Sequence, residues 1–181
     1  LLPKVTLVAT TAYQNVDFTS RTGRKKVNGF GSSSLGARYQ IYQKGAYVGA
    51  VQGSFILAGA GENIADADLG RGGNGYELRA LAGRSFKLFN RDGFIDLQSA
   101  WIYRAGDSPD TFKDDVTVGL FVKKKMQVLA QGFYSRTNAQ VLDFDRILAN
   151  ESSKLQLSVV RTRSEKQSMQ FGVFRTVAGR N

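Results

Sequence analysis

The chain has 181 residues, 20 of them glycine, and carries a formal net charge of +10 with a sequence pI near 10. Its length suits a single β-domain spanning residues 1–181. The sequence contains no histidine and no cysteine, which excludes histidine-based catalysis and argues against a zinc site.

Short segments that alternate apolar and polar residues with a period of two recur along the whole chain, which is the pattern of half-buried β-strands. In chain order we expect strands at residues 4–18, 30–43, 46–59, 75–88, 94–104, 111–122, 126–137, 153–162 and 167–178. The links alternate in length: residues 44–45, 89–93, 123–125 and 163–166 suit hairpins, whereas 19–29, 60–74, 105–110 and 138–152 are longer. This rhythm predicts an all-β fold, an antiparallel up-and-down transmembrane β-barrel with nine visible strands.

The alternation assigns each side chain to one face of its strand. Tyr76 and Leu78 alternate with Glu77 and Arg79, although Leu81 interrupts the polar face. Because membrane barrels turn apolar residues toward lipid and polar residues toward the lumen, the pattern predicts both surfaces. Lipid-facing positions are expected at Tyr39, Leu78, Leu97, Trp101, Leu120 and Phe171. Polar residues lining the lumen are expected at Arg38, Glu77, Arg79, Asp96, Gln98, Arg104, Gln131, Gln156 and Gln170.

The hairpin between segments 75–88 and 94–104 can be given a register. If Leu88 pairs with Gly93, the two apolar faces stay together and Glu77 lies opposite Arg104. The sequence therefore predicts an ion pair between these two side chains inside the barrel. A barrel of about eight to ten strands is narrow, so we expect its polar side chains to fill the interior rather than leave a wide channel.

Three stretches carry a resemblance to a known group of proteins. They are residues 75–101, GYELRALAGRSFKLFNRDGFIDLQSAW, followed by PDTFKDDVTVGLFV and the terminal FGVFRTVAGRN. From Tyr76 to the C-terminus the chain resembles proteobacterial outer-membrane β-barrel proteins of unassigned activity. The resemblance implies a bacterial outer-membrane location. Since the short turns of such barrels face the periplasm, the N-terminal end is expected on that side.

The end of the chain departs from this group, whose last strand usually finishes on an aromatic residue. Here the sequence reaches Asn181 after the ninth expected strand, and the first and ninth strands of an up-and-down sheet run in the same direction. Bacterial single-chain barrels normally have an even number of strands, and an open seam would expose unpaired backbone groups to hydrocarbon. We therefore expect a tenth strand beyond Asn181, with pairing to another chain as the alternative.

The positive charge includes two clusters, one in the first long link and one in a short link. They are Arg21, Arg24, Lys25 and Lys26, and Lys123, Lys124 and Lys125. Expected partners are outer-membrane lipids, including lipopolysaccharide and other anionic head groups, or envelope proteins, with plain solvation of the loops as the alternative. Basicity also fits nucleic acid, but no zinc pattern, RNP-type motif or helix-turn-helix accompanies it, so nucleic acid is not an expected partner.

Catalytic constellations are scarce. Outer-membrane phospholipases, lipid A deacylases, palmitoyltransferases and omptin-type proteases depend on a histidine, and acidic pairs such as Asp114–Asp115 and Asp143 with Asp145 are more often solvated than catalytic. We expect a non-enzymatic barrel without metal or cofactor, serving as an anchor or subunit of a cell-envelope assembly or as a small pore. The alternative is a soluble calycin-like barrel that binds a small apolar ligand and therefore has an apolar interior and a polar exterior.

Overall fold

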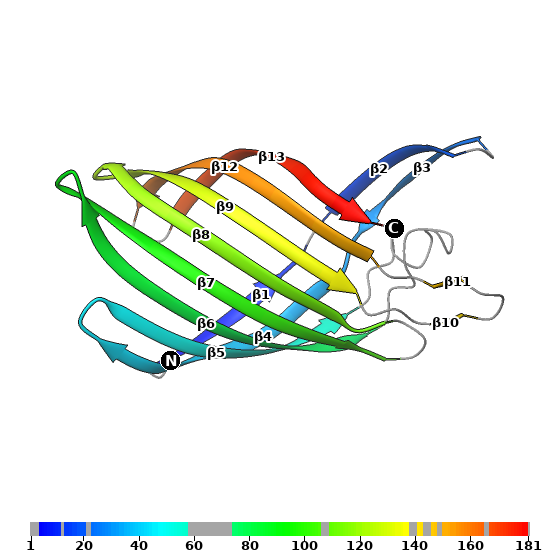
Figure 1. The fold of residues 1–181 in the computed structure, drawn as a ribbon, viewed down its shortest axis with the longest axis horizontal. Helices are drawn as coiled ribbons and strands as arrows, with labels where there is room; N and C mark the ends of the chain where they lie inside the picture. The colour runs from blue at the N-terminus through cyan, green and yellow to red at the C-terminus, as the bar shows by residue number, and fades with distance from the viewer. Residues whose placement is uncertain are drawn as a thin grey trace.

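The computed structural model describes residues 4–11, 13–20, 23–57, 74–105, 109–137, 141–142, 146–147, 150–164 and 167–180. They form a nine-stranded antiparallel sheet and two short hairpins (Figure 1). The sheet contains, in spatial order, β1 (Val5–Thr10), β4 (Ser33–Lys44), β5 (Tyr47–Leu57), β6 (Gly75–Leu88), β7 (Arg91–Arg104), β8 (Thr111–Lys123), β9 (Met126–Thr137), β12 (Asn150–Ser164) and β13 (Gln167–Arg180). The hairpins are β2 (Tyr13–Ser20) with β3 (Gly23–Phe30), and β10 (Val141–Leu142) with β11 (Arg146–Ile147).

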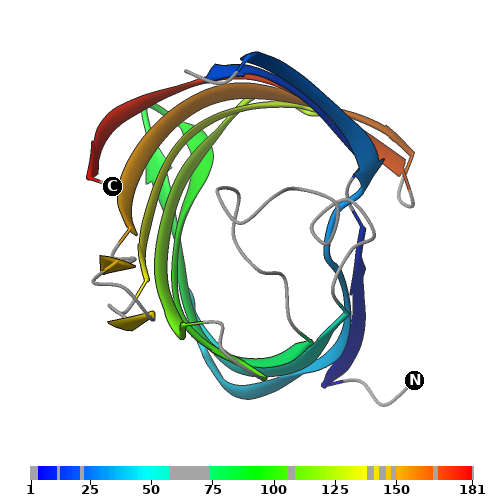
Figure 2. The ribbon, with the colours of Figure 1, turned by 90° about the vertical axis from the view of Figure 1, so that its right-hand side faces the viewer.

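The nine-stranded sheet curls strongly, which gives it a concave and a convex face (Figure 2). Apart from the β2–β3 and β10–β11 hairpins, each strand pairs with the next along the chain, so the expected antiparallel up-and-down arrangement of nine strands is confirmed. Within the described residues the sheet is not closed, because β1 and β13 are its two edges and each pairs with one neighbour. Since every pairing is antiparallel, these two edge strands run in the same direction.

The connections separate by length as the sequence predicts. The tight turns β4–β5, β6–β7, β8–β9 and β12–β13 gather at one end of the sheet, which we call the turn end (Figure 1). The β2–β3 hairpin, the β10–β11 hairpin and the strand ends that are joined through the longer connections β5–β6, β7–β8 and β9–β12 lie at the opposite end, the loop end. The two ends of the molecule therefore present different kinds of backbone.

The first expected strand, residues 4–18, is wrong as a single element. Strand β1 ends at Thr10, where it pairs with Ser34 near the start of β4. The backbone ladder between β1 and β4 ends there, and Tyr13–Ser20 pairs instead with Gly23–Phe30. Most of the link expected at 19–29 is accordingly strand β3.

The register expected for the β6–β7 hairpin is wrong by two residues. Leu88 pairs with Arg91 rather than with Gly93, and Glu77 lies opposite Ile102 rather than Arg104. The cause is a two-residue turn in which both Phe89 (φ 49°) and Asn90 (φ 58°) adopt the left-handed backbone conformation that closes a tight hairpin. Because a shift of two residues preserves side-chain alternation, every residue of the hairpin keeps its predicted face.

The small buried apolar core of the described residues lies on the concave face. It consists of Ile56, Leu81, Ala100, Ile102 and Leu129, and Leu81 is the residue that interrupts the polar pattern of its strand. Glycine leaves room for an aromatic ring on this face, since the ring of Phe94 lies over Gly119, where an added Cβ would come within 2.2 Å of the ring. This core includes few of the described apolar side chains, and many of the large ones are exposed.

Candidate functional site

Polar side chains on the concave face form rows that run across the strands. Residues opposite each other in register point to the same face of a sheet. Arg38 pairs with Gln52, and Gln52 pairs with Arg79, which places these three side chains in one row. A second row joins Asp96, Thr117, Gln131 and Gln156 across β7, β8, β9 and β12. The rows bring together residues that are far apart in the sequence.

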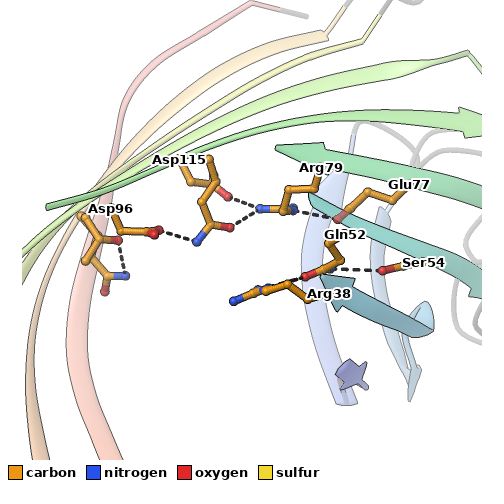
Figure 3. Close-up of polar contacts among 10 residues, drawn as sticks. Arg38, Gln52, Ser54, Glu77, Arg79, Asp96 and Asp115 are labelled. Carbon is orange, nitrogen blue, oxygen red and sulfur yellow. Dashed lines mark hydrogen bonds and ion pairs between the residues drawn. The ribbon is translucent and has the colours of Figure 1, made fainter. Parts of the chain in front are cut away.

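The grouping with the most charged residues is the Arg79 cluster, which comprises Glu77, Arg79, Asp96, Gln98 and Asp115. Figure 3 labels its four charged members. Arg79 Nε donates to Glu77 Oε1 at 2.8 Å, and Arg79 Nη1 donates to Gln98 Oε1 at 2.8 Å and to Asp115 Oδ2 at 2.9 Å. Gln98 Nε2 in turn donates to Asp96 Oδ1. The guanidinium is thus held between two carboxylates from β6 and β8, and its side chain is only 14% exposed.

A second grouping, the Arg38 cluster, links β4 to β5. Arg38 Nε and Nη2 both donate to Gln52 Oε1, at 3.0 and 2.9 Å, and Gln52 Nε2 donates to Ser54 Oγ at 3.1 Å. Gln52 and Ser54 are both buried. Arg38 and Gln52 are paired in register, and Ser54 lies two residues after Gln52 on the same strand, so all three side chains point to the concave face. Figure 3 labels the three residues and draws the bonds between them.

A third grouping, the Gln131 cluster, joins β8, β9, β12 and β13. Gln131 Oε1 accepts hydrogen bonds from Gln156 Nε2 (3.2 Å), Ser158 Oγ (3.0 Å) and Gln170 Nε2 (2.9 Å). Gln131 Nε2 donates to Thr117 Oγ1 at 3.3 Å. One amide therefore connects four neighbouring strands, and Ser158 at its centre is 1% exposed.

The structure brings together most of the polar residues singled out in the sequence. Those that join the three clusters are Arg38, Glu77, Arg79, Asp96, Gln98, Gln131, Gln156 and Gln170. Arg104 lies on the same face but opposite Gly75, and its backbone N–H donates to Asp110 Oδ1 at 3.4 Å. The predicted Glu77–Arg104 pair is therefore replaced, in the case of Glu77, by the ion pair with Arg79.

Sequence reasoning missed Asp115, Gln52 and Ser158 as members of these clusters. The sequence places Asp115 beside Asp114 as a solvated acid, yet both lie within β8 and point to opposite faces, since Asp115 pairs with Gln98 and Asp114 with Ser99. The sequence signal that assigns Asp115 to the polar face is the alternation of Asp115 and Thr117 with Val116 and Val118. Asp143 and Asp145 lie outside the described residues.

The residues predicted to face lipid lie on the convex face. Leu78 and Trp101 are directly paired, and Leu97 pairs with Ala82 on one side and Val116 on the other. Their side chains remain exposed, as do those of Tyr39 and Phe171, and Leu120 is partly exposed.

The two basic clusters lie at opposite ends of the sheet. Lys123, Lys124 and Lys125 form the β8–β9 turn at the turn end. Arg24, Lys25 and Lys26 fall in β3 at the loop end, and Arg21 lies outside the described residues.

The side chains of the three clusters hydrogen-bond mainly to one another. Among the described side chains there is no group of three or more acidic, histidine or cysteine residues placed to hold a metal ion. The described residues also contain no helix that is both long and apolar enough to cross a bilayer. The chain matches no protein-family model, and no curated protein or solved structure is significantly similar to it. Any function must therefore be argued from the two faces of the sheet.

Proposed function

We propose that this chain forms a transmembrane β-barrel of the bacterial outer membrane and serves as a non-enzymatic anchor or subunit of a cell-envelope assembly. The observation that carries the proposal is that apolar side chains are exposed on the outside of the sheet and charged side chains are shielded on its inside, the reverse of a protein surrounded by water. On the convex face Leu78 is 68% and Phe171 is 67% exposed, whereas the concave side chains of Glu77 and Arg79 are 12% and 14% exposed. Contiguous apolar surface of this extent is rare on a protein surrounded by water and is favoured in hydrocarbon.

Aromatic residues on the convex face support a membrane location. Tyr47 lies near the turn end of β5 and Phe55 near its loop end, where Phe55 packs against Tyr76 with ring centroids 5.2 Å apart. Trp101 and Tyr103 extend the second group on β7. The two groups are separated by a strand length of about 26 Å at 3.3 Å per residue, or roughly 20 Å along the axis of a strand tilted by 40°. This spacing agrees with aromatic girdles at the two surfaces of an outer-membrane apolar band.

The proposal requires that the seam between β1 and β13 be bridged. Both edge strands run in the same direction, so one further strand, antiparallel to both, would complete an all-antiparallel ring with an even number of strands. The edge strand β13 is long, and its outward side chains Met169, Phe171 and Val173 are apolar and exposed, so it is suited to pair with a further strand. The expected tenth strand remains a prediction.

The distribution of charge favours this proposal over a soluble calycin-like barrel. A calycin holds its ligand in an apolar interior and exposes polar residues to water. Here the concave face carries the ion pairs of Arg79 with Glu77 and Asp115, and the convex face carries most of the large apolar side chains. An apolar ligand would have to displace or cover these charges.

A small pore is the second candidate function, because a cavity lined by both polar and apolar residues lies on the concave face and includes members of the Arg38 and Arg79 clusters. Its volume is about 170 Å³, and its lining includes Lys4, Thr6, Arg38, Gln40 and Asp96. Planar-bilayer recordings of the purified protein test this candidate. Discrete conductance steps whose ion selectivity changes in an Asp96→Lys variant would support a pore. Bilayers that contain inserted protein but conduct no current would contradict a pore and favour the anchor.

The proposed membrane location is tested by reconstituting the purified chain into detergent micelles and comparing its gel migration before and after boiling. A membrane β-barrel resists mild detergent and migrates differently when unboiled, so we expect two distinct bands. The same chain should remain in the membrane fraction after a carbonate wash. A protein that stays soluble and monodisperse without detergent would contradict the proposal.

A further inference from the structure

Basic residues are concentrated at the turn end, in every one of its four tight turns. We define the turn-end ring by its described cations, which are Lys44, Arg84, Lys87, Arg91, Lys123, Lys124, Lys125, Arg161 and Arg163. In the sequence of these turns and their flanks, the acidic residues are Asp92 and Glu165. The excess of positive charge is therefore a property of the whole end of the molecule and not of the lysine run alone.

The loop end has a different charge balance. Residues 58–74 contain three acidic residues, Glu62, Asp66 and Asp68, and one cation, Arg71. Residues 105–110 contain Asp107 and Asp110 and no cation. Only the first long connection, which contains β2 and β3, is basic. Charges that only keep a protein soluble need not gather at one end of it. The turn-end ring is therefore better explained by an anionic partner that contacts the turn end.

Within the described residues, the ion pair found in the turn-end ring is that of Lys87 with Asp92. Lys87 Nζ lies 3.8 Å from Asp92 Oδ1, and the two side chains are 81% and 74% exposed, so this ion pair is weak. Arg91 donates to the backbone carbonyl oxygen of Val122, which holds its guanidinium between two adjacent turns without cancelling its charge. The positive potential is thus available to an external anion.

The ring adjoins the aromatic group of the convex face. The Arg84 guanidinium lies 5.1 Å from the centre of the Tyr47 ring, and Arg84 pairs with Tyr47 in register on the convex face. Tyr42 and Phe89 are also exposed at this end. Tyrosine beside arginine is the combination found where a membrane protein passes from hydrocarbon to head groups.

We propose that the turn-end ring binds the phosphates of anionic phospholipids in the membrane leaflet at the turn end. The inference rests on the proposed membrane location. Cations spread over turns from β4 to β13 fit an annulus of separate head groups, whereas a compact acidic protein would favour one dense patch. Each lysine or arginine near an anionic surface contributes about 1 kcal/mol, or roughly a fivefold preference, which salt weakens.

The test uses the full chain reconstituted in phosphatidylcholine vesicles, with spin-labelled phosphatidylglycerol or spin-labelled phosphatidylcholine as probe. Electron spin resonance reports the lipid immobilised on the protein, and the ratio of the two probes gives the relative association constant. We expect phosphatidylglycerol to be preferred by roughly twofold or more at low salt, and the preference to fall toward one at 1 M salt.

Two charge-matched variants locate the preference. The variant Lys123→Gln, Lys124→Gln, Lys125→Gln should lose much of it, whereas the control Arg24→Gln, Lys25→Gln, Lys26→Gln should retain it, since it removes the same charge from the loop end. If the first variant fails to insert, Arg161→Gln with Arg163→Gln removes two ring cations from another turn. Equal loss in ring and control variants would overturn the inference.

The outcomes separate the inference from the function on which it rests. Immobilised lipid without any preference for phosphatidylglycerol would leave the membrane barrel in place and overturn lipid binding by the ring, leaving an acidic protein as its partner. No immobilised lipid at all would contradict the membrane location itself. A salt-sensitive preference confined to the ring supports both.

Discussion

The two faces of the β6–β7 hairpin carry opposite kinds of side chain, although they are built from the same two stretches of sequence. On the concave face Arg79 and Gln98 join a network of charge-assisted hydrogen bonds, and on the convex face Leu78 and Leu97 are exposed and apolar. The residues of each pair of neighbours, such as Leu97 and Gln98, are separated by one peptide unit. The comparison shows that the strand period of two, rather than position along the chain, determines the environment of each side chain.

The largest expected effect comes from placing a charge on the convex face. Leu97→Arg should lower the free energy of unfolding in vesicles by about 2–4 kcal/mol, which is a loss of stability. Leu97 lies near the middle of β7, and arginine is costly at the bilayer midplane. Leu120→Arg should cost less, since Leu120 pairs with Gly93 near the turn end. Denaturant titration in vesicles measures both.

Gln98→Arg is the matched control on the concave face. It introduces the same side chain one residue away, where it loses the hydrogen bond from Arg79 and has Asp96 and Asp115 as neighbours. It should therefore cost clearly less than Leu97→Arg. Equal costs at positions 97 and 98 would remove the distinction between the faces.

The second effect concerns close packing on the concave face. Gly119→Ala should destabilise the fold by about 1–3 kcal/mol, because the new Cβ would meet the Phe94 ring at 2.2 Å and the ring must move. Gly53→Ala is the control, since nothing lies within 4 Å of its added Cβ. Unfolding titrations should show a loss in the first variant alone, and similar losses in both would indicate a backbone effect instead.

The third effect is the coupling between Arg79 and Asp115. A double-mutant cycle with Arg79→Met and Asp115→Asn should give about 1–2 kcal/mol, because both side chains are shielded and the donor–acceptor distance is 2.9 Å. The same cycle on Lys87 and Asp92, which are exposed at the turn end, should give no measurable coupling. Equal coupling in the two cycles would show that the concave face does not shield its charges.

The smallest effect is expected in the β6–β7 turn. Asn90 has a φ of 58°, a conformation that glycine adopts without strain, so Asn90→Gly should change stability by less than about 1 kcal/mol, in the favourable direction. Ala46→Gly, in the β4–β5 turn, should be slightly unfavourable, because only its neighbour Gly45 has a positive φ there. Thermal unfolding of the two variants side by side tests the assignment of the turn.

Much of the sheet could be predicted from sequence because alternation is a local signal. Segments 75–88, 111–122 and 126–137 agree with β6, β8 and β9 to within a residue, and the polar residues assigned to one face do share it. A face assignment needs only the parity of each position, so it survived the two-residue error in the β6–β7 register.

Other features depended on partners that the local pattern does not contain. The end of β1 at Thr10 depends on where β4 begins. The tight β6–β7 turn depends on the left-handed backbone of Phe89, a residue type that does not predict such a conformation as glycine would. The cluster around Gln131 requires the registers of four strands at once. Long-range pairing, rather than residue type, decides these contacts.

The most direct test of the two-faced sheet uses the absence of native cysteine. Leu97→Cys and Gln98→Cys place a single thiol on either face of β7, and both are then exposed, in vesicles, to a charged maleimide and to a lipid-soluble one. Cysteine at 97 should react with the lipid-soluble reagent only, whereas cysteine at 98 should be protected from it. Equal labelling of both positions by the charged reagent in vesicle-bound protein would contradict an outward-facing apolar surface in lipid.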